Sequence, residues 1–285
     1  MVEFTKMRGA GNDFILVETG DMNTDRAAAS RAMCDRHYGI GADGLLLLMP
    51  SDIADLKMRI FNADGSESEM CGNGLRRMLR YYLDKENIAG KTGKIRVETA
   101  AGIREAEYNE TSEIKVSMGT PAFGENDIPV KAGECKVDIK QLLVCNINVA
   151  GNAFRLNMVS MGNPHAIYFT DNPVMDFPLS DIGPEITGNE LFPEGINFEV
   201  ARVLDRKTIE VRAWERGVGE TLACGSGACA AAVAAILHDY VENIVNVHLP
   251  GGILKTDWDG SDEVYLSGPA KTVFTGEWKG LRRKR

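Results

Sequence analysis

The chain has 285 residues, about twice the usual domain length, so two domains of medium size are expected. Lys and Arg total 32 against 41 Asp and Glu, and the net charge of −9 with 44% hydrophobic residues excludes a disordered chain and a basic nucleic-acid-binding protein. Six cysteines without a CxxC pair, and no apolar stretch of signal-peptide or membrane-span length, predict a reduced, cytoplasmic protein without a membrane partner.

The apolar periodicity predicts many strands and few helices. In the first half we expect a helix over residues 25–38, strands over 14–19, 45–49 and 56–62, and a hairpin over 94–109 that turns at 100–102. In the second half we expect strands over 142–149, 153–161, 196–204, 208–214 and 244–249. Two further helices of about a dozen residues are expected to begin at Cys71 and Cys224.

The two helix starts at Cys71 and Cys224 are related in sequence. Both segments have the order strand, turn, Glu, Cys-Gly-x-Gly, helix, with CGNG at 71–74 and CGSG at 224–227. The same register pairs Arg59 with Arg212, Glu67 with Glu220, Asn62 with Glu215 and Gly44 with Asn197, and a two-residue offset pairs Gly11-Asn12 with Gly162-Asn163. These matches indicate an internal duplication, with two similar domains that face each other.

A cysteine at a helix start lies among unpaired backbone N–H groups, at the positive end of the helix dipole. The thiolate is favoured there, and the N–H groups that follow can hold a carboxylate. The alternative is that Cys71 and Cys224 are small buried apolar residues and that the glycines only form turns. The occurrence of the arrangement twice, in matched frames, favours the functional interpretation.

Two opposed thiols suit a reaction that removes a proton from one face of a carbon and returns a proton to the other face. Backbone N–H groups at two helix starts would hold a substrate carboxylate and stabilise the charge that develops when the proton leaves. No cofactor or metal motif is expected to share this task. Residues 39–44 spell GxGxxG, but they follow a helix and precede a strand, which is the reverse of the dinucleotide-binding order. Cys34 and His37 lack a second pair of metal ligands nearby.

Five motifs, in order along the chain, resemble those of the diaminopimelate epimerase family. They are KMRGAGNDF at 6–14, FNADGS at 61–66 with CGNG at 71–74, MGNPH at 161–165, WERG at 214–217 with GET at 219–221, and ACGSGAC at 223–229. The resemblance implies an α+β protein of two similar domains, each a mostly antiparallel sheet wrapped around a central helix. Residues 1–119 and 268–285 would form the domain with Cys71, residues 120–267 the domain with Cys224, and the active site would lie in the cleft between them.

The resemblance also implies a function and its residues. The reaction would be cofactor-independent interconversion of LL- and meso-2,6-diaminopimelate, which supplies lysine and peptidoglycan precursors, and the enzyme would be a homodimer, with Phe274 a candidate contact. Cys71 and Cys224 would be the catalytic acid and base, and His165 would support the site. The substrate-binding residues would be Asn12, Asn62, Gly72, Asn73, Asn163, Asn197, Glu215, Arg216, Gly225 and Ser226.

One position departs from the family pattern, because Gly44 occupies a place where some members have a glutamine that contacts substrate.

Three alternatives to the diaminopimelate reaction also remain. The first is another cofactor-independent enzyme of this fold, such as a proline racemase or hydroxyproline epimerase. The second is a thiol redox protein in which Cys71 and Cys224 form a disulfide. The third is a non-enzymatic binder of small molecules.

Overall fold

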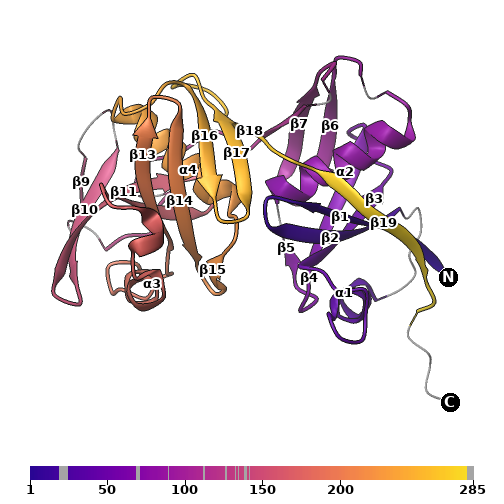
Figure 1. The fold of residues 1–285 in the computed structure, drawn as a ribbon, viewed down its shortest axis with the longest axis horizontal. Coiled ribbons are helices and arrows are strands. Elements are labelled where there is room, and N and C mark those ends of the chain that lie inside the picture. The colour runs from indigo at the N-terminus through magenta and orange to yellow at the C-terminus, as the bar shows by residue number, and fades with distance from the viewer. Residues whose placement is uncertain are drawn as a thin grey trace. The chain divides into compact units, whose positions relative to one another are not determined.

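The computed structural model describes residues 1–18, 25–68, 71–88, 90–111, 113–125, 127–131, 133, 135–137, 140 and 142–280. The chain forms two compact units (Figure 1). The first consists of Met1–Ser117 with Ser267–Arg285, and the second of Met118–Leu266. Each unit is a curved sheet with its own helices and core.

The sheet of the first unit wraps around a helix, α2 (Gly72–Lys85). Its strands pair in the order β19 (Lys271–Trp278), β1 (Val2–Gly9), β2 (Asn12–Glu18), β3 (Gly44–Met49), β4 (Leu56–Asn62), β6 (Gly93–Thr99), β7 (Gly102–Tyr108) and β8 (Ile114–Ser117), and β5 (Glu67–Ser68) pairs with β4. Only β2–β3 and β4–β6 are parallel among these pairs. Helix α2 packs against β1, β2, β3, β4, β8 and β19, and α1 (Arg26–Cys34) packs against β3 and β4.

The second unit repeats this arrangement around α4 (Gly225–Leu237). Its strands pair in the order β9 (Cys135–Val137), β10 (Leu143–Val149), β11 (Asn152–Ser160), β12 (Pro164–Phe169), β13 (Asn197–Asp205), β14 (Thr208–Glu215), β16 (Ile244–Leu249) and β17 (Gly252–Asp257). Strand β15 (Gly219–Thr221) pairs with β14, while η2 (Val174–Asp176), α3 (Leu179–Thr187) and β18 (Tyr265–Ser267) complete the elements. Helix α4 contacts six strands, and its run of small residues, from Ala228 to Ala235, is fully buried.

The duplication expected from the sequence is confirmed by the topology. The series β1, β2, β3, β4, β5, α2, β6, β7 corresponds to β11, β12, β13, β14, β15, α4, β16, β17, with parallel pairs at the same two places. The offset pair also has a structural basis: Gly11 and Gly162, with φ of 79° and 86°, each occupy the turn between corresponding strands. The expected fold class, two similar α+β domains built around central helices, is therefore confirmed.

The expected elements and the observed ones differ at several boundaries. The helix expected over 25–38 ends at Cys34, because the Asp35 carboxylate accepts hydrogen bonds from the backbone N–H groups of His37 and Tyr38 and starts a turn. The strand expected over 14–19 begins at Asn12, and Thr19 lies outside the described residues. The sequence did not predict β1, β12 or α3; α3 contains Pro184, which is unfavourable inside a helix.

Candidate active site

The first expected thiol, Cys71, is the N-cap residue of α2. Its backbone is extended, with φ of −147° and ψ of 106°, and its sulfur accepts a hydrogen bond from the N–H of Gly74 at 3.4 Å. The sulfur therefore takes the position in which an oxygen of Ser or Asp usually caps a helix. Gly72 and Asn73 follow in the first turn and are buried.

Asparagine side chains of the first unit connect this helix start to the β1–β2 turn. Asn73 Nδ2 donates to Asn12 Oδ1 at 2.9 Å, and Asn12 Nδ2 donates to Asp43 Oδ2 at 3.3 Å. Asn62 is the last residue of β4; it is exposed, and its Nδ2 donates to Ser66 Oγ at 2.9 Å. The structure thus brings Asn12 and Asn73 together beside Cys71, while Asn62 makes its contact within its own turn.

The glycine that departs from the family pattern lies at the first position of β3. A β-carbon added at Gly44 would lie 2.8 Å from the carbonyl oxygen of Phe61 and 3.0 Å from the Phe14 ring. Real β-carbons do not approach neighbouring atoms this closely, so the packing of Phe14 and β4 requires glycine here. The missing side chain is a consequence of how this unit packs its core.

The second expected thiol, Cys224, caps α4 in the same way. Its sulfur accepts from the N–H of Gly227 at 3.3 Å and lies 3.5 Å from Ser226 Oγ. Burial raises the pKa of the Cys224 thiol well above its ordinary value, and the nearby carboxylates of Glu215 and Glu199 raise it further. A helix start was expected to favour the thiolate; at Cys224 burial and the two carboxylates act in the opposite direction.

A chain of polar contacts leads from the core of the second unit to Cys224. Glu199 Oε1 lies 2.7 Å from His165 Nδ1, and both side chains are 0% exposed. His165 Nε2 lies 3.1 Å from Asn163 Oδ1, and Asn163 Nδ2 donates to Ser226 Oγ at 3.3 Å. The parallel pairing of β12 with β13 places His165 and Glu199 on adjacent strands. His165, expected only to support the site, is thus connected to the thiol through Asn163 and Ser226.

The remaining expected residues of the second unit lie around the end of β14. Asn197 Nδ2 donates to the Pro164 carbonyl oxygen at 2.9 Å, and its Oδ1 accepts from the Arg216 backbone N–H at 3.0 Å. The Arg216 guanidinium donates to the carbonyl oxygen of Glu194 at 2.8 Å. Glu215 interacts with the Thr221 hydroxyl, and burial raises the pKa of its carboxyl group. Gly225 lies in the first turn of α4.

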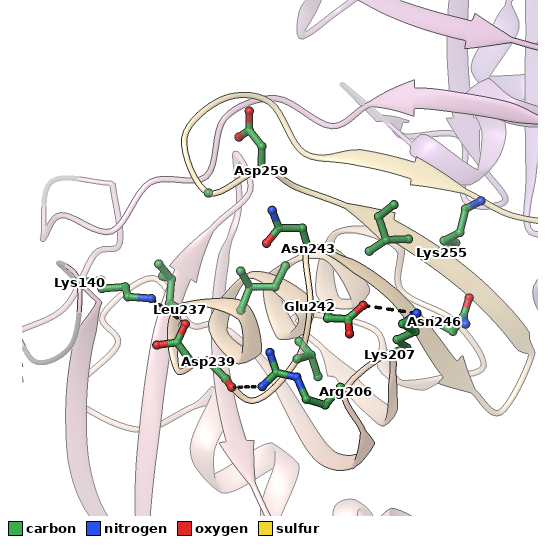
Figure 2. Close-up of a pocket in the computed structure, with 14 residues that line it drawn as sticks. Lys140, Arg206, Lys207, Leu237, Asp239, Glu242, Asn243, Asn246, Lys255 and Asp259 are labelled. Atoms are coloured by element: carbon green, nitrogen blue, oxygen red, sulfur yellow. Dashed lines mark hydrogen bonds and ion pairs between the residues drawn. The ribbon is translucent and has the colours of Figure 1, made fainter.

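A pocket of about 760 Å³ lies elsewhere in the second unit, at the C-terminal end of α4 (Figure 2). Its charged side chains interact with one another: Lys140 Nζ lies 2.9 Å from Asp239 Oδ1, and Lys207 Nζ lies 3.5 Å from Glu242 Oε2. Cys224 lies at the opposite end of the 13-residue helix, about 20 Å away. The pocket is therefore separate from the site built around Cys224.

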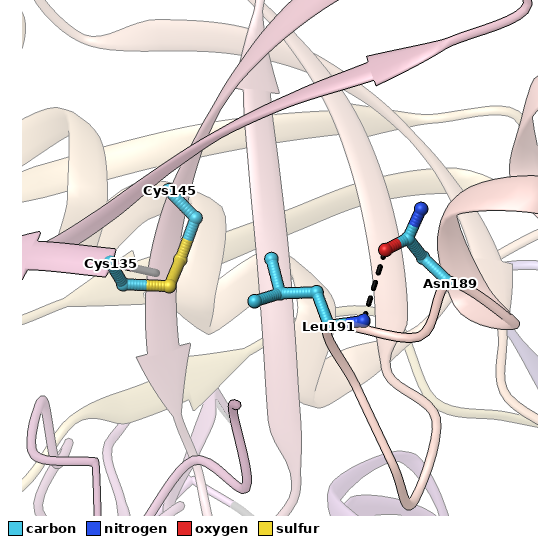
Figure 3. Close-up of a disulfide and its surroundings, with 4 residues drawn as sticks. All are labelled: Cys135, Cys145, Asn189 and Leu191. Atoms are coloured by element: carbon cyan, nitrogen blue, oxygen red, sulfur yellow. Dashed lines mark hydrogen bonds between the residues drawn. A yellow bond between two sulfur atoms is a disulfide. The ribbon is translucent and has the colours of Figure 1, made fainter. Parts of the chain in front are cut away.

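Two of the cysteines form a disulfide that the sequence did not indicate (Figure 3). Cys135 on β9 and Cys145 on β10 are directly opposed in the antiparallel register, with Cα atoms 4.4 Å apart. This spacing is that of a closely approaching cross-strand pair, which brings the two sulfurs within bonding reach. The expectation that all six cysteines are reduced is wrong for this pair, because their opposition depends on strand register and no motif announces it.

Comparison with known proteins identifies the family. A family model described as Diaminopimelate epimerase matches residues 4–124 and 157–273. A diaminopimelate epimerase of Caldanaerobacter subterraneus subsp. tengcongensis is 44% identical over 280 residues, which span 97% of this chain and 99% of that one. The chloroplastic diaminopimelate epimerase of Oryza sativa subsp. japonica is 42% identical over 284 residues, which span 96% of this chain and 79% of that one. The chain belongs to the diaminopimelate epimerase family.

Solved structures extend the fold of this family to more distant proteins. A probable proline racemase from Agrobacterium radiobacter K84 superposes with a TM-score of 0.68 at 13% identity, covering 98% of this chain and 93% of that one. A PhzF-family phenazine biosynthesis protein from Bacillus anthracis superposes with a TM-score of 0.64 at 17% identity, covering 96% of this chain and 98% of that one. At these identities the likeness concerns the fold alone.

Sequence reasoning missed one buried residue of the site, Glu199. Its neighbours in β13 are mostly apolar, so a carboxylate in this buried strand was an available signal. The internal alignment pairs Glu199 with Leu46, which shows that only one of the two domains places a charge there.

No helix among the described residues is both long and apolar enough to cross a membrane.

Proposed function

We propose that this protein interconverts LL- and meso-2,6-diaminopimelate by proton transfer at one α-carbon, with Cys71 and Cys224 as acid and base. The observation that carries this proposal is the matched placement of the two thiols at the N-caps of α2 and α4 in two domains of the same topology. Membership of the diaminopimelate epimerase family supports the choice of substrate. The product, meso-diaminopimelate, would supply the synthesis of lysine and of peptidoglycan precursors.

In the proposed reaction one thiolate removes the α-proton and the other thiol delivers a proton to the opposite face, which inverts the carbon. The backbone N–H groups of the two helix starts, at Gly72-Asn73 and Gly225-Ser226, hold the α-carboxylate and stabilise the charge that develops on it. The proposal assigns residues 1–119 with 268–285 to one domain and 120–267 to the other, with the substrate bound in the cleft between them. Water exclusion by domain closure would strengthen these electrostatic interactions.

Polar side chains would recognise the two amino-acid ends of the substrate. Asn12, Asn62, Asn163 and Asn197 are assigned hydrogen bonds to its ammonium and carboxylate groups, with Glu215 and Arg216 reading its charges. Some of these groups now bond to neighbouring side chains, as Asn12 does to Asn73 and Asn163 to Ser226, and such bonds could be exchanged for bonds to substrate. His165 supports this set through its contact with Asn163.

The proposal also covers assembly and location. Homodimerisation is proposed through the face that carries β19, where Phe274 is 47% exposed. A cytoplasmic location is proposed from the requirement of Cys71 and Cys224 for reducing conditions, because a disulfide between them could transfer no proton. The buried Cys135–Cys145 disulfide is the exception to these conditions. No nucleic acid takes part, in keeping with the net charge of −9.

Incubation with LL-diaminopimelate in deuterated water under reducing conditions tests the proposal. We expect deuterium at the α-carbon together with formation of the meso isomer, since the returning proton comes from a thiol that exchanges with solvent. L-Proline and trans-4-hydroxy-L-proline, incubated in parallel, test the racemase alternative. Absence of deuterium from diaminopimelate would exclude the proposed reaction.

Separate Cys71→Ala and Cys224→Ala variants test the two-thiol mechanism. Each should abolish epimerisation while the protein still folds, with Cys229→Ala, a buried residue on the same helix as Cys224, as the control that retains turnover. Unchanged substrate binding with no exchange in any form of the protein would identify a non-enzymatic binder. A disulfide between Cys71 and Cys224 formed reversibly during turnover with a dithiol would identify a redox protein.

A further inference from the structure

Two residues that the internal repeat preserves have no role in the mechanism above. The ungapped register between residues 59–74 and 212–227 leaves five identical positions. Three of them belong to the Cys-Gly-x-Gly of the helix starts, and the other two pair Arg59 with Arg212 and Glu67 with Glu220. The repeat has therefore kept one arginine and one glutamate in the segment that leads to each thiol.

In the first unit this arginine and this glutamate form an ion pair with two parallel hydrogen bonds. Arg59 Nε donates to Glu67 Oε1 at 2.5 Å, and Arg59 Nη2 donates to Glu67 Oε2. The guanidinium also lies 5.1 Å from the centre of the buried Phe61 ring. The contact raises the pKa of Arg59 and lowers the pKa of Glu67, so both groups are charged at neutral pH. A bidentate contact of this kind restricts geometry as well as adding energy.

The second unit has the same pair in more enclosed surroundings. Arg212 Nε donates to Glu220 Oε1 at 2.9 Å, and Arg212 Nη2 lies 2.9 Å from the same oxygen. Arg212 is buried, and its Nη1 also donates to the carbonyl oxygens of Val174 at 2.8 Å and Phe177 at 2.9 Å. The contact between arginine and glutamate is thus common to both units, whereas the contacts to η2 belong to the second alone.

Strand pairing places the two ion pairs at the same point of corresponding turns. Phe61 is opposite Glu67 across β4 and β5. Trp214 is opposite Glu220 across β14 and β15. Each arginine lies two residues before the aromatic residue, so it occupies the same strand face and is diagonal to the glutamate, a separation that a long side chain spans. Each ion pair therefore joins the strand that enters a turn to the strand that leaves it.

Each of these turns begins with a residue that we assign to substrate binding. Asn62 is the last residue of β4, and Glu215 is the last residue of β14. Both are bonded across their own turn, Asn62 to Ser66 Oγ at 2.9 Å and Glu215 to the Thr221 hydroxyl. In both units the cysteine follows the paired glutamate by four residues. Each ion pair thus lies along the chain between a substrate-binding candidate and a thiol.

Support of the fold alone does not account for keeping both pairs. The side chains of Arg59 and Glu67 are 28% and 35% exposed, and ion pairs that reach solvent contribute little to stability. A comparable pair on the same strand, Lys57 with Glu98 at 2.7 Å, is not repeated. The strand register places Glu210 and His248 at the corresponding positions of the second unit. The pairs beside the thiols were kept where this one was not.

We propose that the two Arg–Glu pairs position the substrate-binding ends of the β4–β5 and β14–β15 turns. Each pair holds its turn closed, so that Asn62 or Glu215 keeps a fixed place relative to the thiol that follows in the same unit. The effect on substrate binding rests on the proposed function; the rigidity of the turns does not. The paired residues are positioning residues, since they act through Asn62 and Glu215.

Glu67→Gln and Glu220→Gln test the rigidity of the turns without requiring catalysis. The amide keeps the shape of the side chain and removes the charge that the arginine binds. Hydrogen–deuterium exchange, followed by mass spectrometry, should be faster by about tenfold over residues 62–68 in Glu67→Gln and over 215–221 in Glu220→Gln, because a lost charge-assisted contact eases local opening. Glu98→Gln, which breaks the ion pair to Lys57 on the same strand β4, is the control and must leave both turns unchanged. Unchanged exchange in Glu67→Gln overturns the proposal, and this variant decides the matter if Glu220→Gln does not fold.

Kinetics of diaminopimelate epimerisation separate positioning from support of the fold. We expect KM to rise by about tenfold in Glu67→Gln with a smaller change in kcat, the pattern of a weakened binding contact, while the urea midpoint of unfolding stays the same. The Arg59→Met/Glu67→Gln double variant should lose no more than Glu67→Gln, since both changes remove one contact. A lowered urea midpoint with unchanged KM identifies a purely structural pair and overturns the proposal. Faster exchange in the variants of a protein that does not epimerise diaminopimelate keeps the role in holding the turns and rejects the proposed function.

Discussion

At the scale of single residues, the two catalytic candidates show how a shared local motif acquires different chemistry from its surroundings. Both cysteines accept one hydrogen bond from the first turn of a helix, which favours a thiolate. Around Cys224, however, burial and the carboxylates of Glu215 and Glu199 favour the neutral thiol. The cap alone therefore does not determine which sulfur carries the proton.

Glu199→Gln isolates the carboxylate contribution at Cys224. The amide keeps an oxygen for His165 Nδ1 but removes a charge that raises the pKa of the Cys224 thiol, so that pKa should fall. The ultraviolet absorbance of the thiolate, followed against pH in a Cys71→Ser background, measures this change. The matched control is Glu210→Gln, a half-exposed carboxylate on β14. A pKa that stays the same or rises would contradict the assignment.

At the scale of secondary structure elements, the corresponding helices α2 and α4 differ in how well the first turn would accept a side chain in place of glycine. A β-carbon at Gly227 of α4 would lie 2.4 Å from Glu199 Oε1, whereas one at Gly74 of α2 would lie 2.9 Å from a methyl group of Leu46. The leucine end can move by a change of rotamer, but Glu199 is held by His165. The second helix start is therefore the less adaptable of the two.

Matched Gly74→Ala and Gly227→Ala variants test this difference. Gly227→Ala should lower the free energy of unfolding by about 1–3 kcal/mol, as overpacking of a core does, and should also disturb the His165–Glu199 contact. Gly74→Ala should cost less, because its neighbour can give way. Urea unfolding of both variants supplies the comparison, and equal losses, or a larger loss for Gly74→Ala, would show that Glu199 is not rigidly held.

Short sequence patterns predicted the elements that depend on residues close together in the chain. The Cys-Gly-x-Gly pattern located the starts of both α2 and α4, and the hairpin over 94–109 is confirmed as β6 and β7. Elements with weaker patterns were missed: α3 contains Pro184, and β12 begins with Pro164 and lacks an alternating pattern. The Cys135–Cys145 disulfide and the His165–Glu199 contact depend on pairing between strands, which no local pattern encodes.

The disulfide closes a short loop and should stabilise the second unit. Its cysteines are ten residues apart, for which loop entropy predicts about 2–3 kcal/mol. The free energy of unfolding of the wild type, measured in urea, should be lower by about this amount when a reductant is present. Strand β9 pairs only with β10 among the described strands, so no second strand pairing would compensate for the lost bond. A Cys135→Ser/Cys145→Ser double variant should show no effect of the reductant; if it responds as wild type does, another pair of thiols is responsible.

At the scale of the whole molecule, duplication has supplied two units whose framework is shared and whose buried charges are not. The repeat was visible in the sequence because it preserves the cysteines and glycines of the helix starts, together with the pairs Arg59 and Arg212, Glu67 and Glu220, and Asn12 and Asn163. The asymmetry was not visible, because Glu199 gains its meaning from burial, and burial depends on how each sheet wraps its helix. The proposed mechanism, in which one thiol is ionised and the other protonated, would gain from such divergence between the two units.

This asymmetry predicts the pH dependence of kcat/KM for epimerisation of LL-diaminopimelate. The acid limb should follow protonation of the Cys71 thiolate and the basic limb loss of the Cys224 proton. Because burial raises the pKa of Cys224, the basic limb should lie above about 8.5, the ordinary value for cysteine. Glu199→Gln should move only the basic limb downward, since Glu199 raises the pKa of the Cys224 thiol of its own unit. Movement of both limbs in this variant, or a basic limb below the ordinary value, would show that Glu199 does not act on Cys224 alone.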